Sequence, residues 1–177
     1  MSSQKSIQFA HTKYYMQYIS YQGIYDGTNF EDAATPKQIT KSMNAGFSTM
    51  VNVWRISGKL YLGVTQPITE VTEKYLTGPR FWLNAMNTDM QSWIVTQPTK
   101  SYPNYFWFPT DTENTPVTAS NGKIITPGTV AINNTSVVFL PEIQDRGMFS
   151  TVHLRCFGVC SNYLSFIKRM RNEGEWY

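Results

Sequence analysis

The stretch "MVNVWRISGKLYLGV", residues 50–64, predicts two strands joined by a tight Ser-Gly turn. Successive side chains of a pleated strand point to opposite faces, so Met50, Asn52 and Trp54 share one face. The opposite face carries Val51, Val53 and Arg55. Asn52 is thus a single amide in an apolar stretch. It is either a buried polar group with a hydrogen-bond partner or part of a site.

Composition predicts one folded domain over residues 1–177, with a polar N-terminal leader at 1–14. The chain is 41% hydrophobic and balances 15 basic against 12 acidic residues, which argues against a disordered chain. The short basic run "KRMR", residues 168–171, is interpreted as the solvated face of a terminal helix. We therefore expect no specific binding of nucleic acid.

Sequence signals for export and for metal binding are weak. No apolar run approaches the roughly 20 residues that a membrane span needs, and the leader lacks the apolar centre of a secretion signal. We expect an intracellular protein, in the cytoplasm or within an assembly such as a virion, that is not secreted. Cys156 and Cys160, four residues apart on one expected strand, would be about 13 Å apart and are expected to remain thiols. With only His11 and His153 to help, they do not complete a zinc site.

Hydrophobic periodicity alternates between strands and helices in the first half of the chain. We expect helices after Thr35, within 69–79, over 88–95 and over 163–172. Strands are expected within 16–25, 80–87, 104–108, 122–128, 136–142 and 156–160, and no helix between Pro109 and Ser136. The early alternation favours an α/β fold with parallel strands, a reduced (β/α)8 TIM-type barrel with several helices short or missing. An antiparallel sandwich is the alternative, which the second half would suit.

Several landmarks occur in the order found in a known family. They are "GKLYLG" at 58–63, "WLNAMN" at 82–87, "NYFWF" at 104–108, "TPG" at 126–128, "LPE" at 140–142 and "GVCSNY" at 158–163. Together they resemble a small bacterial branch of the glycerophosphodiester phosphodiesterase-like TIM barrels. The resemblance implies two histidines for acid–base chemistry on a phosphodiester and a carboxylate cluster for a divalent cation.

The positions that match the family's reactive groups carry other residues here. The first histidine and the arginine correspond to Tyr21 and Gln22, and the two acidic ligands of the second strand to Met50 and Asn52. The remaining matched positions are Val64 and Thr65 for the second histidine and acid, Asn84 and Met86 in the "HAKN" pattern, Phe108 for a late histidine, and Asn162 for a late aspartate. The resemblance therefore implies a vestigial pocket with no catalytic residue, metal or cofactor.

Three functions follow as hypotheses. The first is a pseudoenzyme that serves as a structural or interaction subunit, in a virus particle or a large cellular complex, with aromatic anchors such as Tyr102, Tyr105, Trp107 and Phe149. The second is a module that binds a glycan or a phosphate-bearing headgroup in the vestigial pocket. The third is a residual metal-dependent hydrolase that uses His11 or His153, with Glu31, Asp111 and Glu142 as the acids near the matched landmarks.

Overall fold

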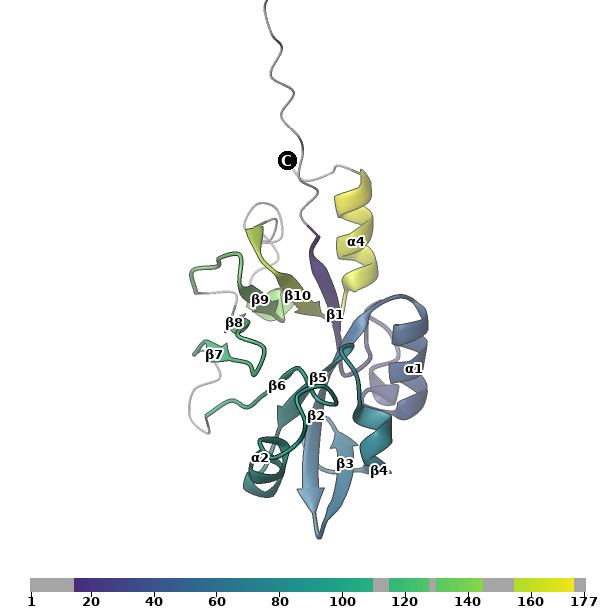
Figure 1. Ribbon diagram of the computed structural model, residues 1–177. Helices are drawn as coiled ribbons and strands as arrows, with labels where there is room; N and C mark the ends of the chain where they lie inside the picture. The colour runs from purple at the N-terminus through teal and green to yellow at the C-terminus, as the bar shows by residue number, and fades with distance from the viewer. Residues whose placement is uncertain (1–14, 110–114, 128–129, 145–154, 174–177) are drawn as a thin grey trace, which may run out of the picture.

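The computed structural model describes residues 15–109, 115–127, 130–144 and 155–173. Ten strands form one mixed sheet, and four α-helices pack around it in the described part (Figure 1). The strands are β1 (Gln17–Tyr21), β2 (Ser48–Ile56), β3 (Lys59–Gly63), β4 (Thr69–Val71), β5 (Phe81–Ala85), β6 (Tyr105–Phe106), β7 (Val117–Thr118), β8 (Ile124–Pro127), β9 (Ser136–Phe139) and β10 (Gly158–Ser161). The helices are α1 (Pro36–Asn44), α2 (Thr88–Ile94), α3 (Pro141–Gln144) and α4 (Leu164–Glu173).

Parallel pairing links the central strands in the order β6-β5-β2-β1-β10-β9-β8. Strand β2 is long enough to use one edge twice: its first residues pair with β1, and its last pair antiparallel with β3. The predicted hairpin is confirmed, with positive φ angles at Ser57 (49°) and Gly58 (81°). The first part of the chain thus supplies β1 to β6, the last part supplies β7 to β10, and the two blocks join along β1 and β10.

The expected (β/α)8 TIM-type barrel is wrong. The sheet is mixed and not closed, because strand pairing in the described residues ends at β6 on one side and at β7 on the other. Antiparallel pairs β2–β3, β3–β4 and β7–β8 stand where a barrel would need parallel strands and crossover helices. The described residues between β6 and β9 contain no helix. The alternative, an antiparallel sandwich, does not match the parallel order of the central strands either.

The sheet nevertheless curls around an apolar interior. Ile19, Met50, Trp82, Phe106 and Val137, each from a different strand, belong to one buried cluster. The rings of Phe108 and Phe139, which follow and end strands far apart in the sheet order, have centroids 5.4 Å apart. Such contacts between the two ends of the strand order require strong curvature of the sheet.

Helices α1, α2 and α4 pack on the outer face of the sheet. Val51 and Val53 belong to a second cluster, with Ile39 of α1 and Met90 of α2. A third cluster lies under α4 and includes Leu164 and Ile167 (Figure 1). Met50 and Val51 therefore face opposite cores, as the strand alternation predicts, and β2 is buried on both faces.

Local signals account for the helices that the sequence predicts correctly. The Thr35 hydroxyl accepts a hydrogen bond from Gln38 N at 3.3 Å, and Pro36 takes the first position of α1. Helix α2 begins as expected, but its N-cap is Asn87, whose Oδ1 accepts from Met90 N at 3.1 Å.

The helix expected within 69–79 is replaced by β4 and a short 3₁₀ turn, Glu73–Leu76, because Thr69–Val71 pairs with the free edge of β3. Cys156 and Cys160 form no disulfide, as expected, and lie in different apolar clusters. Of the described helices, none has both the length and the apolar character required to cross a bilayer.

Candidate functional site

A cavity of about 610 Å³ opens at the carboxyl ends of the parallel strands. Its wall contains the last residue of β1, Tyr21, and the last residue of β9, Phe139. Strands β2 and β5 contribute Asn52 and Asn84 side by side, since these two residues are partners in the parallel register. The complete lining is Tyr21, Asn52, Val64, Thr65, Asn84, Ala85, Met86, Gln91, Phe108, Pro109, Phe139, Leu140 and Ile143.

The structure brings together most of the pocket residues that the sequence predicts. They come from four segments far apart in the chain, and those that line the cavity are Tyr21, Asn52, Val64, Asn84, Met86 and Phe108. Tyr21 and Asn84 lie at or next to the carboxyl ends of parallel strands, and Val64, Met86 and Phe108 follow a strand by one or two residues. Asn52 is in the middle of β2, beside Asn84 in the parallel register. The residues thus share one cavity, although the sheet that carries them is not the expected barrel.

Three of the predicted pocket residues do not line the cavity. Gln22 is buried behind it, where its Oε1 accepts a hydrogen bond from Asn52 N at 3.2 Å. Met50 lies in the apolar interior with its Sδ 3.6 Å from Cys160 Sγ. Asn162 binds Glu142, to whose Oε1 it donates from its backbone N at 2.8 Å and from its Nδ2 at 3.1 Å.

A short chain of amide hydrogen bonds forms one wall of the cavity. Asn52 Nδ2 donates to Val64 O at 2.7 Å, and Asn52 Oδ1 accepts from Asn84 Nδ2 at 2.9 Å. Asn84 Nδ2 also lies 3.2 Å from Met86 Sδ. Because the carbonyl of Val64 can only accept, this chain fixes the orientation of both amides. Asn52 is therefore a hydrogen-bonded residue of the cavity wall, so the two alternatives posed by the sequence both describe it.

The amide chain ends in a buried acceptor. Asn84 is 7% exposed, and its Oδ1 is buried with no hydrogen-bond partner among the described residues. A buried polar atom without a partner costs about 1–3 kcal/mol. The atom is closed off from the cavity, so a bound water or ligand could reach it only if the wall moved.

The lining carries no charged side chain among the described residues, and its polar groups are amides and hydroxyls. This donor set does not fit the divalent cation that the resemblance implies. Met50 offers a thioether in the core, Asn52 Oδ1 already accepts a hydrogen bond, and hard cations prefer carboxylate oxygens. Within 15–109, 115–127, 130–144 and 155–173, no three His, Cys, Asp or Glu side chains are grouped as metal ligands.

The two described acidic residues of the sequence hypotheses, Glu142 and Glu31, lie outside the cavity lining. Glu142 is held at the start of α3, where its Oε2 accepts from Ser161 Oγ at 3.0 Å. Glu31 lies in a short 3₁₀ helix, Phe30–Asp32, and does not line the cavity. His11, Asp111, Phe149 and His153 are outside the described residues.

Sequence reasoning missed several residues of the cavity wall. Phe139, Leu140 and Ile143 come from the end of β9 and from α3, a helix that the sequence does not predict. Leu140 has a φ of 44°, an unusual value for a branched residue, and it turns the chain sharply between β9 and α3. Gln91 comes from α2, one turn after the N-cap. The signal that the sequence offers for the turn between β9 and α3 is the dipeptide Leu140-Pro141, directly after the strand.

Comparisons of the chain with protein-family models, with curated proteins and with solved structures found no match.

Proposed function

We propose that this protein is a non-catalytic binding module whose cavity takes an uncharged, hydroxyl-rich ligand such as a sugar. The observation that carries the proposal is the lining: amides and hydroxyls on one side, aromatic rings on the other, and no charged side chain among the described residues. A volume of about 610 Å³ is in the usual range for small-molecule sites.

The chemistry of the wall favours a sugar over other neutral ligands. Each sugar hydroxyl both donates and accepts hydrogen bonds, so a sugar can pair with the amide and hydroxyl groups of the lining, such as those of Gln91 and Thr65. Phe108 and Phe139, whose centroids are 5.4 Å apart, offer apolar surface for the C–H face of a sugar ring. A phosphate-bearing headgroup is disfavoured, because no Lys or Arg lines the cavity to pair with it.

A blocking variant tests the proposal. Thr65 is exposed at the cavity, so Thr65→Trp should fill the mouth without disturbing the amide chain. We expect ligand-observed NMR with a panel of neutral mono- and disaccharides to detect a binder for the unaltered protein and none for Thr65→Trp. Thr65→Ser is the matched control and should retain binding.

The panel also separates neutral from charged ligands. Sugar phosphates should bind more weakly than the corresponding free sugars, since the cavity offers no cation. If no neutral sugar binds, or if Thr65→Trp still binds, the proposal is wrong.

A second candidate function is the interaction subunit suggested by the sequence. Its support is the rim of the same cavity, where Val64, Met86 and Ile143 are 36%, 37% and 71% exposed. Exposed apolar side chains grouped around a mouth are typical of protein docking surfaces. Native mass spectrometry of the protein purified from its source should then show a bound partner that Ile143→Asp releases, whereas Val95→Asp, an exposed apolar residue outside the lining, should retain it.

A further inference from the structure

Three cations lie around one pair of aromatic rings at the amino end of β2, two over the rings and one on the backbone beside them. The rings of Tyr25 and Phe47 have centroids 5.2 Å apart. Lys41 Nζ of α1 lies 5.9 Å from the Tyr25 ring, and Lys168 Nζ of α4 lies 5.6 Å from the Phe47 ring. Arg80 donates to Phe47 O at 2.6 Å and also to Met43 O. We call Lys41, Arg80 and Lys168 together the basic surface.

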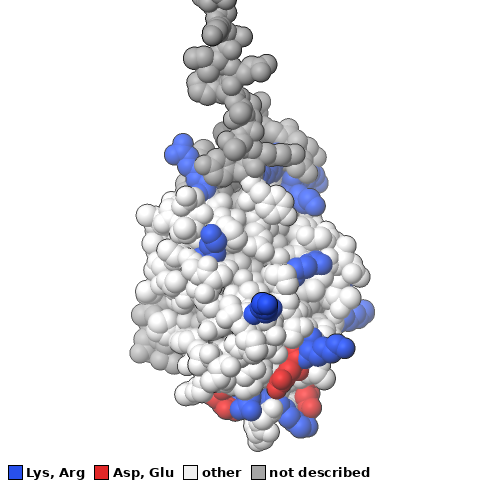
Figure 2. Space-filling view, in the orientation of Figure 1, with Lys and Arg blue, Asp and Glu red and all other residues white. Residues whose placement is uncertain are grey.

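No described acidic side chain lies within ion-pair distance of these three cations. The ion pairs of the described residues, Arg55–Asp89 and Lys59–Glu70, involve none of the three cations. Residues 33–69 and 155–172, which include α1 and most of α4, contain no Asp or Glu at all. In Figure 2 the visible acidic side chains gather at the lower end, while basic ones extend up the right-hand edge, on the side where Figure 1 shows α1 and α4.

The basic surface and the cavity lie at opposite ends of the sheet. Phe47 directly precedes the first residue of β2, whereas the cavity is lined from the carboxyl ends of the strands. A ligand at one site therefore does not touch the other. The basic surface is a separate feature, and its function does not rest on that proposed for the cavity.

We infer that the basic surface binds the phosphate backbone of nucleic acid without reading its sequence. All three cations have exposed side chains, and attraction between cations and phosphates supplies most of non-specific affinity for nucleic acid. Phe47 is only 4% exposed, so its ring supports the cations and offers no face on which a base could stack. Contacts of this kind fix position on the backbone and carry no sequence information.

An acidic protein is the less suitable partner. Protein interfaces depend on large apolar or aromatic anchors near their centre. The exposed aromatic residue of α4 nearest in sequence to Lys168 is Phe166, two residues earlier and hence on a different side of the helix. Between the cations, the described chain exposes Asn44, Ala45 and Gly46, which offer no such anchor.

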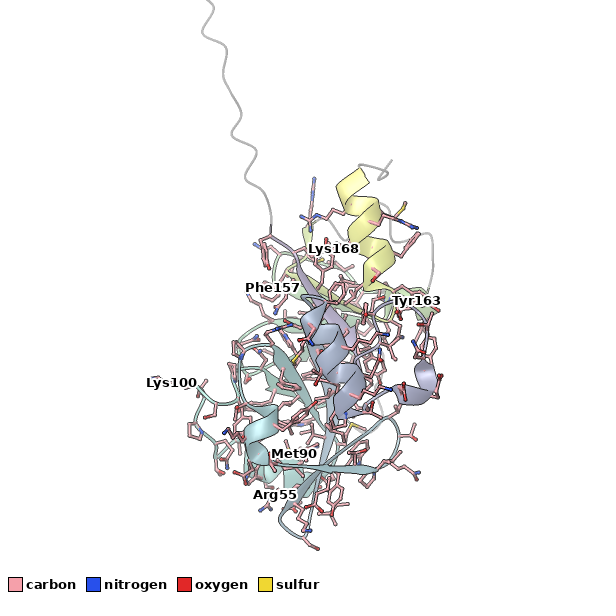
Figure 3. All side chains as sticks on the ribbon, turned by 90° about the vertical axis from the view of Figure 1, so that its right-hand side faces the viewer. Arg55, Met90, Lys100, Phe157, Tyr163 and Lys168 are labelled. Carbon is pink, nitrogen blue, oxygen red and sulfur yellow. The ribbon has the colours of Figure 1, made fainter. Side chains whose placement is uncertain are left out.

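Salt-dependent binding tests this inference. Fluorescence anisotropy with a labelled duplex of random sequence should give a logarithmic salt dependence with a slope of about −3 for three phosphate contacts. Lys41→Gln and Lys168→Gln should each reduce the slope by about 1 and weaken binding equally for unrelated sequences. Lys59→Gln removes the same charge from the β2–β3 hairpin, beside Arg55, which Figure 3 shows at the opposite end of the molecule from Lys168, and it should leave the slope unchanged.

Three results would overturn the inference. They are no binding at about 20 mM salt, where screening is weak, an equal loss of affinity in Lys59→Gln, and displacement of the duplex by polyglutamate at the same charge concentration. The last result would assign the surface to an acidic protein. Thermal melts of each variant establish that the folded state is retained, since exposed Lys→Gln changes have little effect on stability.

Discussion

Gly63 of β3 stands at a position where no side chain fits. A Cβ added there would lie 1.7 Å from Gln66 O, and the neighbouring Val64 O is the acceptor that holds Asn52. The backbone of the loop that follows β3 therefore packs directly against Gly63. The cavity wall depends on this close approach of two backbone segments.

Replacing this glycine should be costly. We expect Gly63→Ala to lower the free energy of unfolding by about 3 kcal/mol, because the loop backbone must move to admit the methyl group. Urea denaturation measures the loss. Gly46→Ala is the matched control: nothing lies within 4 Å of its Cβ, and only its φ of 92° opposes alanine, so it should cost about 1 kcal/mol. Equal losses in the two variants would contradict the steric explanation.

Cys156 should make stability fall at alkaline pH. Burial raises the pKa of its thiol from 9.0 to about 11, so between these values the folded protein retains a proton that the unfolded chain releases. The contribution of the buried thiol to the free energy of unfolding is then fully present below pH 9.0 and is lost as the pH rises toward about 11. A shift of two units is equivalent to about 3 kcal/mol.

The measurement compares the unaltered protein with Cys156→Ala, because tyrosines and lysines also titrate in this range. Urea unfolding is measured at pH 8, about one unit below the pKa of the unfolded thiol, and at about pH 10.5, between the two pKa values. The free energy of unfolding should decrease less between these two pH values for the variant. An identical decrease would mean that Cys156 is ionised to the same extent in both states.

At the scale of the element, Asn87 joins α2 to the central strand. Its Oδ1 accepts from Met90 N and from Arg55 N, both at 3.1 Å, and its Nδ2 donates to Arg55 O at 2.8 Å. One side chain therefore caps α2 and also pairs with the backbone of β2 at Arg55, beyond the last residue of β2 that pairs with β5. The Thr35 hydroxyl, by contrast, caps α1 and makes one further hydrogen bond, to Asp32 O at 2.7 Å in the preceding turn.

These two caps should differ in cost. Thr35→Ala should destabilise the protein by about 1 kcal/mol, the usual cost of losing a helix cap. Asn87→Ala should cost about 3 kcal/mol, because it also leaves two backbone groups of Arg55 without partners. Differential scanning calorimetry can compare the two, with Lys37→Ala as an exposed helix control. Equal costs would show that water replaces the Arg55 bonds.

The sequence predicts those elements whose signals are local. The hairpin of β2 and β3 follows from alternation around Ser57 and Gly58, and α1 follows from Thr35 and Pro36. Strands β4 and β7 were missed, since each has at most three residues and exists only through pairing with a neighbour. Helix α3 was missed for the same reason of length.

At the scale of the whole molecule, one serine holds the two ends of the strand order together. Ser120 N donates to Tyr105 O at 2.8 Å, Ser120 Oγ accepts from Tyr105 N at 2.8 Å, and Ser120 Oγ donates to Pro103 O at 2.9 Å. These bonds link the segment around β6 to the turn between β7 and β8. They do not extend into a ladder, so the sheet stays open there.

Ser120→Ala should loosen this junction without unfolding the protein. We expect the Tyr105 amide to exchange with deuterium about tenfold faster, the equivalent of losing roughly one buried hydrogen bond. Amides in the middle of β2 should exchange at unchanged rates. Ser92→Ala, an exposed serine of α2, is the control. Faster exchange throughout the sheet would show that the junction governs global stability.

The overall topology was the part that sequence reasoning could not reach. Alternation along a strand predicts which of its side chains share a face, whereas it was the family resemblance that placed Tyr21, Asn52 and Asn84 in one pocket, and these three residues line one cavity. Whether the sheet closes depends instead on pairing between β6 and the β7–β8 hairpin, which are distant in sequence. Ser120 and Asn121, whose Nδ2 donates to Asn104 Oδ1 at 2.9 Å, bond to the segment around β6 without forming a strand ladder. No local pattern encodes that pairing.

The division of the sheet into two sequential blocks has a consequence for engineering. Residues 15–109 carry β1 to β6 and residues 115–173 carry β7 to β10, and each block presents an unsatisfied edge, β1 or β10, to the other. Produced as separate fragments, the two halves should reassemble on mixing, as split reporter proteins do. Because Tyr21 and Phe139 come from different halves, the reconstituted complex would regain its cavity only when both are present.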